Sequence, residues 1–494
     1  MQSRPSRQPR TNPLLRSSRP GAALLLASLL ALVSCSGQSK APQPSASRGV
    51  VLLVVDTLRP DHLGFHGYAQ PTSPELDRLA SEGLVFDNCF SGAAATGPAV
   101  AGLLTGRYPN DVRVKDNFRN LPEKAVTLAE ILRQTSRVKT GAVVSNFVLR
   151  KRSKAGLSGA EQGFDYFDDN IVDKEINRPD YFERKAASTT DAALAFLDGL
   201  GEEDRFFLWV HYQDPHGPYS PPPDAPAPPF SRGVATGRHL PVNETESGKG
   251  GIPCYQVIGD ERDPSAYVYL YDAEIAYLDR EVGRLVSELR NRGLLDRVLV
   301  VLTADHGEAL GEHDYWFSHG ENTYGEVVRV PLVIRYPDPS WHPRGEDGQP
   351  VRRHDGLVGH VDLFSTILEA MGTPAPPSRG ESLLGRLPSR ERVLLQEHRD
   401  PFSGATWFAA TDDRYRLIVR DDRSSLLVDY RKDREETVDL SLDRAEAVDR
   451  LSRAMEELVS AQGWKIKGDP EDEPPFSREE LEILEKLGYI DPGK

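Results

Sequence analysis

Continuously apolar runs alternate with amphipathic stretches along most of the chain, and this alternation predicts strands followed by helices. Residues 50–56 and 298–306 are apolar until their final residues, which is typical of buried parallel strands. Similar runs predict further strands at 84–90, 139–145 and 205–212. The spacing of apolar residues predicts helices at 74–83, 127–134, 180–200, 265–292 and 360–372. We therefore expect an α/β fold with a large mixed, mainly parallel sheet flanked by helices.

The pattern changes near residue 391, which we take as the end of a catalytic domain spanning 49–390. Short alternating runs then predict a small antiparallel sheet at 393–397, 405–410, 415–420 and 426–430, with helices at 444–459 and 477–487. Residues 391–494 are thus predicted to form a C-terminal subdomain. Within the larger domain, residues 221–264 are rich in Pro and Gly and predict a long surface insertion beside the site.

The first 34 residues have the composition of a secretory signal peptide. They hold five arginines and no acid, and the apolar run at 21–33 is shorter than the roughly 20 residues that span a membrane. The sequence LVSC, ending at Cys35, resembles a bacterial lipobox, which predicts lipidation of Cys35 and a Ser/Pro-rich tether over 35–48. A plain cleaved signal is the alternative. We expect an exported cell-envelope lipoprotein, on the outer membrane or facing the periplasm if the source is Gram-negative.

The charge of the chain limits its possible partners, and its cysteine content limits its disulfides and zinc sites. The formal net charge is −15, and it becomes more negative once the arginine-rich signal is removed, which argues against nucleic acid as a partner. Only Cys89 and Cys254 remain after Cys35, and whether they pair stays open for an exported protein. The chain has no His/Cys zinc cluster.

The most informative stretch is residues 93–108, which read AAATGPAVAGLLTGRY. Thr96 lies just before a helix-competent run at 99–104, and Gly106 ends that run. A hydroxyl at a helix start faces outward-pointing backbone N–H groups and a dipole that favours negative charge. Thr96 is therefore a candidate nucleophile for an anionic ester. An ordinary threonine N-cap is the alternative.

Acidic side chains end two of the predicted strands. Asp56 ends the first, and Asp305 with His306 ends the second. Ligands of open α/β sheets bind at the carboxyl ends of the strands, and carboxylate and imidazole groups are ligands of zinc and similar ions. A metal site at Asp56, Asp305 and His306 is the hypothesis, and a structural salt bridge is the alternative.

Three motifs now resemble a known family. The chain contains VVDTLRPDHLGFHGY, TGPAVAGLLTGRYP and ADHGEALGEHDYWFSHGENTYGEVVRVPLVI, in that order. They resemble the sulfatase-like branch of the alkaline phosphatase superfamily over about residues 49–372. The resemblance implies a metal-dependent ester hydrolase with one or two divalent ions (zinc, manganese, calcium or magnesium) and an anionic ester substrate. The family's nucleophile lies ten residues before the final Gly of its motif, which is Thr96 here.

Three departures from the sulfatase pattern bear on the chemistry. Sulfatases need Cys or Ser at the nucleophile position, because that residue is oxidised to formylglycine, and Thr cannot be converted in this way. Val100 stands where the motif has Arg, and Thr57 follows Asp56 where many sulfatases have a second Asp. A threonine nucleophile is similar to the phosphodiesterase and phosphoethanolamine transferase branches, which implies attack on phosphorus.

The resemblance also implies roles for residues further along the chain. His319 matches a histidine of the phosphodiesterase and transferase branches, and Asn117 has the spacing of an Asn that donates to a phosphoryl oxygen. His216 would hold the substrate anion or a second ion, and His211 and Asp214 are further candidates for metal binding. The alternatives are hydrogen-bonded loop histidines and a turn asparagine. Thr96, Asp56, Asp305 and His306 would hold the first ion.

We therefore expect hydrolysis of phosphate mono- or diesters through Thr96, with a lipid anchor on the membrane. The alternatives are a sulfuric ester hydrolase, a phosphoethanolamine-type transferase, and a non-catalytic binding protein on the same fold.

Overall fold

A computed structural model describes residues 47–134, 138–151, 159–400, 403–422 and 424–461. The predicted signal peptide, Cys35, all but the last two residues of the predicted tether and the predicted helix at 477–487 lie outside these residues. Among the described helices, none is long and apolar enough to cross a membrane.

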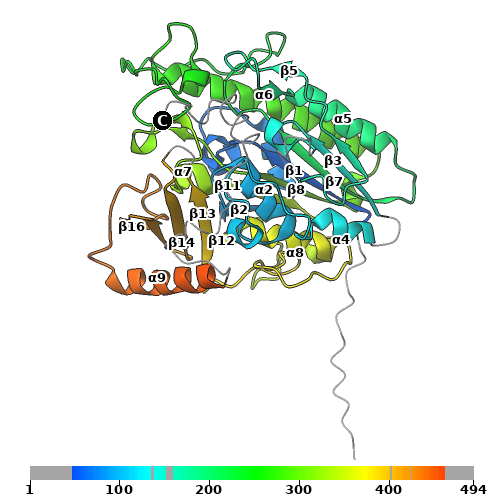
Figure 1. Ribbon diagram of the computed structural model, residues 1–494. Coiled ribbons are helices and arrows are strands. Elements are labelled where there is room, and N and C mark those ends of the chain that lie inside the picture. The colour runs from blue at the N-terminus through cyan, green and yellow to red at the C-terminus, as the bar shows by residue number, and fades with distance from the viewer. Residues whose placement is uncertain (1–46, 135–137, 152–158, 401–402, 423, 462–494) are drawn as a thin grey trace, which may run out of the picture. The chain divides into compact units, whose positions relative to one another are not determined.

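The main sheet has eight strands in the order β12-β2-β11-β8-β1-β7-β3-β4 (Figure 1). Strand β11 is antiparallel to both of its neighbours, and every other pair is parallel. The expected mixed, mainly parallel sheet is confirmed. In chain order its strands are β1 (Gly49–Val55), β2 (Leu84–Phe90), β3 (Val138–Val144), β4 (Tyr166–Asp168), β7 (Arg205–Tyr212), β8 (Val298–Ala304), β11 (Arg329–Arg335) and β12 (Arg353–Gly359).

Helices cover both faces of this sheet. One group, α1 with α5 and α6, packs together, and a second group, α2 with α4 and α8, packs together, with the strands between the two groups in Figure 1. The helices are α1 (Pro74–Glu82), α2 (Thr96–Thr105), α3 (Pro109–Val112), α4 (Leu128–Gln134), α5 (Ala186–Asp198), α6 (Pro264–Asn291), α7 (Gly325–Val328), α8 (His360–Ala370) and α9 (Ala445–Ser460). Two short ribbons, β5 (Asp173–Lys174) with β6 (Phe182–Glu183) and β9 (Ala309–Leu310) with β10 (Trp316–Ser318), complete this part.

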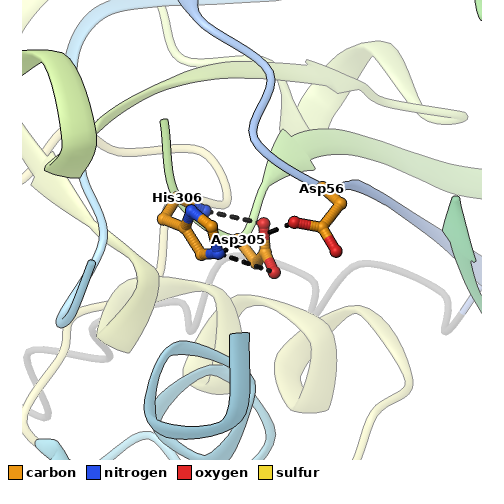
Figure 2. A group of neighbouring side chains, drawn as sticks. All are labelled: Asp56, Asp305 and His306. Atoms are coloured by element: carbon orange, nitrogen blue, oxygen red, sulfur yellow. Dashed lines mark hydrogen bonds and ion pairs between the residues drawn. The ribbon is translucent and has the colours of Figure 1, made fainter. Parts of the chain in front are cut away.

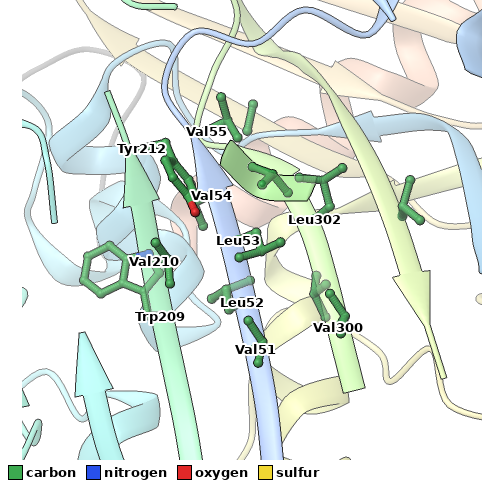
Figure 3. Close-up of a cluster of buried hydrophobic side chains, with 14 of the residues drawn as sticks. Val51, Leu52, Leu53, Val54, Val55, Trp209, Val210, Tyr212, Val300 and Leu302 are labelled. Atoms are coloured by element: carbon green, nitrogen blue, oxygen red, sulfur yellow. The ribbon is translucent and has the colours of Figure 1, made fainter. Parts of the chain in front are cut away.

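The core is built around the central strand β1, all of whose residues are buried (Figure 3). Leu52 lies between Trp209 of β7 and Val301 of β8 in the sheet register. Each fully buried side chain of this kind contributes about 1.5–3 kcal/mol of transfer free energy. Because Val55 pairs with Ala304, the residues that follow β1 and β8 emerge side by side at one edge of the sheet.

The C-terminal segment forms a four-stranded antiparallel sheet, as predicted, and α9 packs on it. Its strands are β13 (Leu394–Arg399), β14 (Thr406–Thr411), β15 (Tyr415–Arg420) and β16 (Ser425–Asp429). Apolar side chains of this sheet, such as Leu395 and Phe408, share one buried cluster with Phe90 and Tyr108 of the larger part. The small sheet is therefore fixed to the large domain through a common core.

Two helices begin more than one residue away from the predicted start. Helix α2 begins at Thr96, earlier than the predicted 99, because Ala95 is extended (φ −148°, ψ 150°) and Pro98 is tolerated in a first turn, where backbone N–H groups have no helical partner. Helix α5 begins only at Ala186, because the residues before it include the short strand β6, and Lys185 is extended. Cys89 is buried, Cys254 is exposed, and both are free thiols.

Candidate active site

The predicted metal ligands converge at the carboxyl ends of β1 and β8. One ligand atom each from Asp56, Asp305 and His306 lies within 4.8 Å of the others, and all three residues are buried (Figure 2). His306 Nε2 lies 3.6 Å from Asp56 Oδ1 and 3.6 Å from Asp305 Oδ2. Adjacent strands thus bring residues that are about 250 positions apart into one cluster, as the parallel register requires.

The electrostatics of this cluster fit a divalent cation. Burial and the neighbouring Asp305 raise the pKa of Asp56 well above its usual value. Burial also lowers the pKa of His306 to about 3, so its imidazole is neutral and able to bind a metal. Asp56 Oδ1 is buried with no hydrogen-bond partner, and neither carboxylate pairs with a lysine or arginine within the described part of the chain. Buried carboxylates need such compensation, so the donor set fits a metal.

Thr96 lies directly beside the cluster. Its Oγ1 is 3.3 Å from His306 Nε2, and the residue is 1 % exposed. The side chain does not cap α2, because Ala95 occupies the N-cap position and no side chain caps there. His306 Nδ1–H donates to the carbonyl of Gly307 (2.9 Å), which assigns Nε2 as the atom that faces Thr96.

His216 and His319 lie next to this group. Their ring centroids are 5.1 Å apart, and the His319 ring is 4.3 Å from that of His306. His216 Nδ1 donates to the Gly217 carbonyl (2.7 Å) and His319 Nδ1 to Glu308 Oε1 (3.0 Å). Both rings therefore leave Nε2 for other partners, and burial lowers the pKa of His216 well below its usual value.

The side chain of Asn117 contacts Gly97 in the first turn of α2. Its Oδ1 accepts the Gly97 N–H (2.8 Å). A Cβ at position 97 would lie 3.1 Å from that oxygen, so glycine permits the close approach. Because the carbonyl is already engaged, the amide nitrogen of Asn117 is the group left to donate.

One pocket includes Thr96, Asn117, His216 and His319 in its wall. The outer wall holds Arg178, whose guanidinium lies over the rings of Tyr181 and Tyr255 (4.3 and 4.2 Å to the centroids). The remaining wall residues include Asp116, Phe118, Asn146, Phe147, Glu175, Gln213, Glu246, His398 and Arg399.

His211 and Asp214 occupy different places. His211 Nε2 is 3.4 Å from Asp305 Oδ2, at the border of the three-ligand cluster. Asp214 instead lies near Lys185, with which its carboxylate interacts electrostatically. Neither belongs to the three-ligand group, so their metal binding stays a prediction.

Sequence reasoning missed two residues that contact the site side chains. Asn146, just after β3, donates from Nδ2 to Asp56 Oδ2 (2.6 Å). Glu308 is fully buried and also accepts the Tyr219 hydroxyl (3.1 Å) while it orients His319. Asn146 follows a predicted strand, so its position at the carboxyl end of that strand could have indicated a site residue. Glu308 lies in a quoted motif, yet nothing in the sequence showed its partner.

Thr57, in place of a second acid, completes the turn after β1. Its φ of 55° is left-handed, which is uncommon for a residue other than glycine. The turn is held by the Thr57 N–H, which donates to Asp305 Oδ1 (3.3 Å), and by the Tyr271 hydroxyl, which donates to the Thr57 carbonyl (2.8 Å). Such backbone strain concentrates at functional sites.

A comparison with protein families decides the family of this chain. A family model described as Sulfatase matches residues 48–373, which is most of the chain and includes β1, α2, β8 and the loop of His319. The protein belongs to the sulfatase family. Sulfatase-superfamily members are metal-dependent hydrolases, so the family agrees with the acidic and imidazole cluster at Asp56, Asp305 and His306.

Two of three similar curated proteins are named sulfatases, and the third is named a multifunctional alkaline phosphatase superfamily protein. Human iduronate 2-sulfatase is 25 % identical over 410 residues, covering 70 % of this chain and 72 % of that protein. N-acetylglucosamine-6-O-sulfatase of Bacteroides thetaiotaomicron is 25 % identical over 478 residues, covering 81 % and 79 %. The multifunctional alkaline phosphatase superfamily protein PehA of Trinickia caryophylli is 26 % identical over 402 residues, covering 68 % and 76 %.

Solved structures show the same fold. A protein in complex with its substrate D-glucosamine-2-N,6-O-disulfate superposes with a TM-score of 0.66 at 20 % identity, covering 87 % of this chain and all of that one. The phosphonate monoester hydrolase of Agrobacterium radiobacter superposes with a TM-score of 0.64 at 23 % identity, covering 84 % and 95 %. The fold thus carries both sulfur and phosphorus chemistry.

Proposed function

We propose that this sulfatase-family hydrolase cleaves phosphate mono- or diesters, with Thr96 as the nucleophile. The observation that carries the proposal is the contact between Thr96 Oγ1 and His306 Nε2 (3.3 Å) at the Asp56/Asp305/His306 cluster. A threonine at this place cannot be converted to formylglycine. An unmodified hydroxyl is a suitable nucleophile for phosphoryl transfer.

The proposed ion is held by Asp56, Asp305 and His306, and when bound it supplies positive charge that stabilises the transferring group and activates the hydroxyl. Thr96 Oγ1 gives up its proton and bonds to phosphorus as the bond from phosphorus to the leaving oxygen breaks, and the leaving oxygen takes up a proton and departs as the alcohol. A water then attacks phosphorus, the bond from phosphorus to Thr96 Oγ1 breaks, and Oγ1 takes up a proton while the water loses one, which releases phosphate or a phosphate monoester. An alcohol in place of that water would make the protein a transferase.

The remaining site residues are assigned to the oxygen atoms of the phosphoryl group. The Asn117 amide nitrogen, left over after its carbonyl accepts Gly97 N–H, donates to a non-bridging oxygen. Donors that are fixed before the reaction stabilise the charge that develops in the transition state. His216 and His319 also line the pocket, and each uses Nδ1 to fix its ring, so Nε2 is the atom assigned to the phosphoryl oxygens.

A sulfuric ester hydrolase is the second candidate, and the named relatives favour it, because iduronate 2-sulfatase and N-acetylglucosamine-6-O-sulfatase are sulfatases. The two candidates predict opposite orders of activity. Purified protein with added divalent ion should be assayed in parallel on a phosphate monoester, a phosphate diester and a sulfate ester of one phenol.

The proposal predicts that at least one phosphate ester has a higher kcat/KM than the sulfate ester, and that Thr96→Ala abolishes this turnover. Thr96→Ser is the matched control, because it retains the hydroxyl and should retain measurable activity. A sulfate ester that reacts faster than both phosphate esters would establish the second candidate. Absence of turnover on all three esters, with the ion bound, would favour a binding protein.

We also propose that the protein is exported and anchored by a lipid on Cys35. The support is the sequence alone: the basic and apolar segments before LVSC, and the Ser/Pro-rich stretch that follows.

A further inference from the structure

We propose that the pocket selects by charge, so that the alcohol part of the ester bears a positive group, such as an amine, and no second anion. The inference rests on the proposed ester hydrolysis, but it does not depend on whether sulfur or phosphorus is attacked. The evidence for it comes from pocket residues other than those assigned to the reacting phosphoryl or sulfuryl group.

The wall contains two carboxylates that share one guanidinium. Glu175 Oε2 lies 2.7 Å from Arg178 Nε, and Glu246 Oε1 lies 3.3 Å from Arg178 Nη1. The side chains of Glu175, Arg178 and Glu246 are 3 %, 11 % and 12 % exposed. Arg178 also lies over the faces of Tyr181 and Tyr255, so it is fixed by ion pairs and by ring contacts. One guanidinium thus faces two carboxyl groups. Burial raises the pKa of both carboxyls and the Arg178 charge opposes that rise, and with both ionised the group has a net negative charge.

Other charges of the pocket do not offset this excess. Among the described residues, the further charged side chains of this wall are Asp116 and Arg399, which have opposite signs and cancel in the total. Burial lowers the pKa of His398 to about 4, so this ring adds no positive charge at neutral pH.

A second acidic group lies near this wall. Lys185 Nζ is 3.0 Å from Glu183 Oε2 and 3.7 Å from Glu274 Oε1, and Asp214 also interacts with it electrostatically. Three acids face one lysine here, but burial raises the pKa of Glu183 to about 7 and the pKa of Glu274 well above its usual value, so this group carries less negative charge than its number of acids. The charge of Lys185 acts on Glu175, and the charge of Glu175 acts on Glu183, so the two groups lie within electrostatic reach of each other.

Gln213 indicates separately that a ligand in this pocket donates a hydrogen bond. Its side chain lines the same wall and is 3 % exposed, and Oε1 has no hydrogen-bond partner among the described residues. A buried acceptor without a partner is unfavourable, so a ligand that donates to it is favoured. An ammonium group supplies such donors together with a positive charge, whereas a carboxylate or a second phosphate supplies neither.

The test uses three esters that differ only in one substituent. They carry an aminomethyl, a hydroxymethyl or a carboxymethyl group at the para position of a phenyl ester, on whichever of phosphate or sulfate the protein hydrolyses. The readout is the ratio of kcat/KM for the aminomethyl ester to that for the carboxymethyl ester. A unit charge about 6 Å away in a partly buried site changes binding by roughly a factor of ten or more. We expect a wild-type ratio of at least about ten.

Variants separate the effect of the pocket from the intrinsic reactivity of the esters. Glu246→Gln and Glu175→Gln each remove one negative charge with little change of volume, and each should lower the ratio at least about threefold. Glu244→Gln is the matched control, because Glu244 is exposed and lies two residues from Glu246 in the same insertion. It should leave the ratio unchanged. The variants must show the wild-type melting temperature to within a few degrees.

The outcomes separate this inference from the proposed function. Turnover of the hydroxymethyl ester with a ratio near one, or a ratio that Glu246→Gln and Glu175→Gln leave unchanged, would overturn the charge selectivity and leave ester hydrolysis intact. A faster carboxymethyl ester would reverse the inference. Absence of turnover on all three esters would instead contradict the hydrolase proposal, on which the inference rests.

Discussion

Three histidines of the site are fixed in the same manner. His216 and His306 donate from Nδ1 to backbone carbonyls, and His319 donates from Nδ1 to Glu308. Partners of this kind set the tautomer and the ring orientation of a functional histidine. The three rings are therefore already oriented, so the reaction does not have to order them.

Asp305 provides the most direct test of the metal site. Asp305→Ala should lower the affinity for the divalent ion by at least about a hundredfold, because loss of an outer partner alone costs 10–100-fold. Elemental analysis of the purified protein, with Asp224→Asn as an exposed acidic control, measures the effect. Full metal content in Asp305→Ala would show that the ion is held elsewhere.

Glu326 is not one of the predicted metal ligands, and the titration of its carboxyl predicts that the stability of the protein depends on pH. Its carboxyl is buried, neither oxygen has a hydrogen-bond partner among the described residues, and burial, with the charges of Glu312 and Glu436, raises its pKa from 4.5 to about 8. Between these two values the unfolded chain has lost the proton that the folded protein keeps, so the free energy of unfolding falls as the pH rises.

Glu326→Gln removes this titration. The variant should match the wild type near pH 4 and be increasingly more stable toward pH 8, as measured by thermal melting at both pH values. A stability difference that does not change between pH 4 and pH 8 would show that Glu326 is ionised in the folded protein.

Some of these residue contacts were accessible from the sequence and others were not. Asp56, Asp305 and His306 end apolar runs, so strand register alone predicts that they meet. The contact of Thr96 with His306 spans 210 residues and followed only from the family motif. The pairing of Glu308 with His319 depends on side-chain packing inside a loop, which has no periodic signal in the sequence.

At the scale of elements, α2 presents Thr96 to the site, and its end is fixed by one glycine. Gly106 has a φ of 64°, and its N–H donates to the Gly102 carbonyl. A Cβ at this position would lie 2.6 Å from Phe364 of α8, so both the backbone angle and the packing require glycine.

Gly106→Ala should lower the free energy of unfolding by about 2–4 kcal/mol, from the left-handed conformation and the overlap with Phe364 together. Gly237→Ala is the matched control. Gly237 has a φ of 70° but open space around its Cβ position, so only the backbone cost of about 1 kcal/mol applies. Chemical denaturation measures both variants, and equal losses would show that contact with Phe364 contributes nothing.

The prediction of elements succeeded where the apolar pattern was strong. Strands β2, β7 and β15 have the predicted bounds, because each is a compact apolar or alternating run. Strands β11 and β12 were not predicted. Strand β11 contains Pro331, and β12 begins with the polar residues Arg353 and His354, so tertiary pairing rather than local pattern makes them strands.

At the scale of the whole molecule, the pocket is assembled from distant parts of the chain. Helix α2 and the loops after the strands of the large sheet supply Thr96, His216 and His319, the predicted insertion at 221–264 supplies Glu246 and Tyr255, and β13 of the C-terminal sheet supplies His398 and Arg399. Lys249 pairs with Glu321 (2.7 Å) and with Asp400 beside β13 (3.1 Å), which links residues 221–264 to the loop of Glu321 and to the C-terminal sheet. The proposed charge selectivity therefore involves segments that the family motifs do not include.

The proposed lipid anchor is tested on the full-length chain. Cys35→Ala should move the protein from the membrane fraction to the soluble exported fraction, because it removes the acceptor of the lipid. Quantitative fractionation measures the shift, with Cys254→Ala as a control that leaves the lipobox unchanged. Membrane association of Cys35→Ala equal to that of the wild type would show that another segment anchors the protein.

The proposed mechanism depends most on the attack of Thr96 Oγ1 on phosphorus. The direct measurement is high-resolution peptide mass spectrometry of protein quenched in acid during turnover of a phosphate ester, with Thr96→Ala as the control. The account predicts a phosphoryl group on Thr96 that appears only with substrate and is absent from the control. Steady turnover of the phosphate ester with Thr96 unmodified, or undiminished turnover by Thr96→Ala, would contradict it.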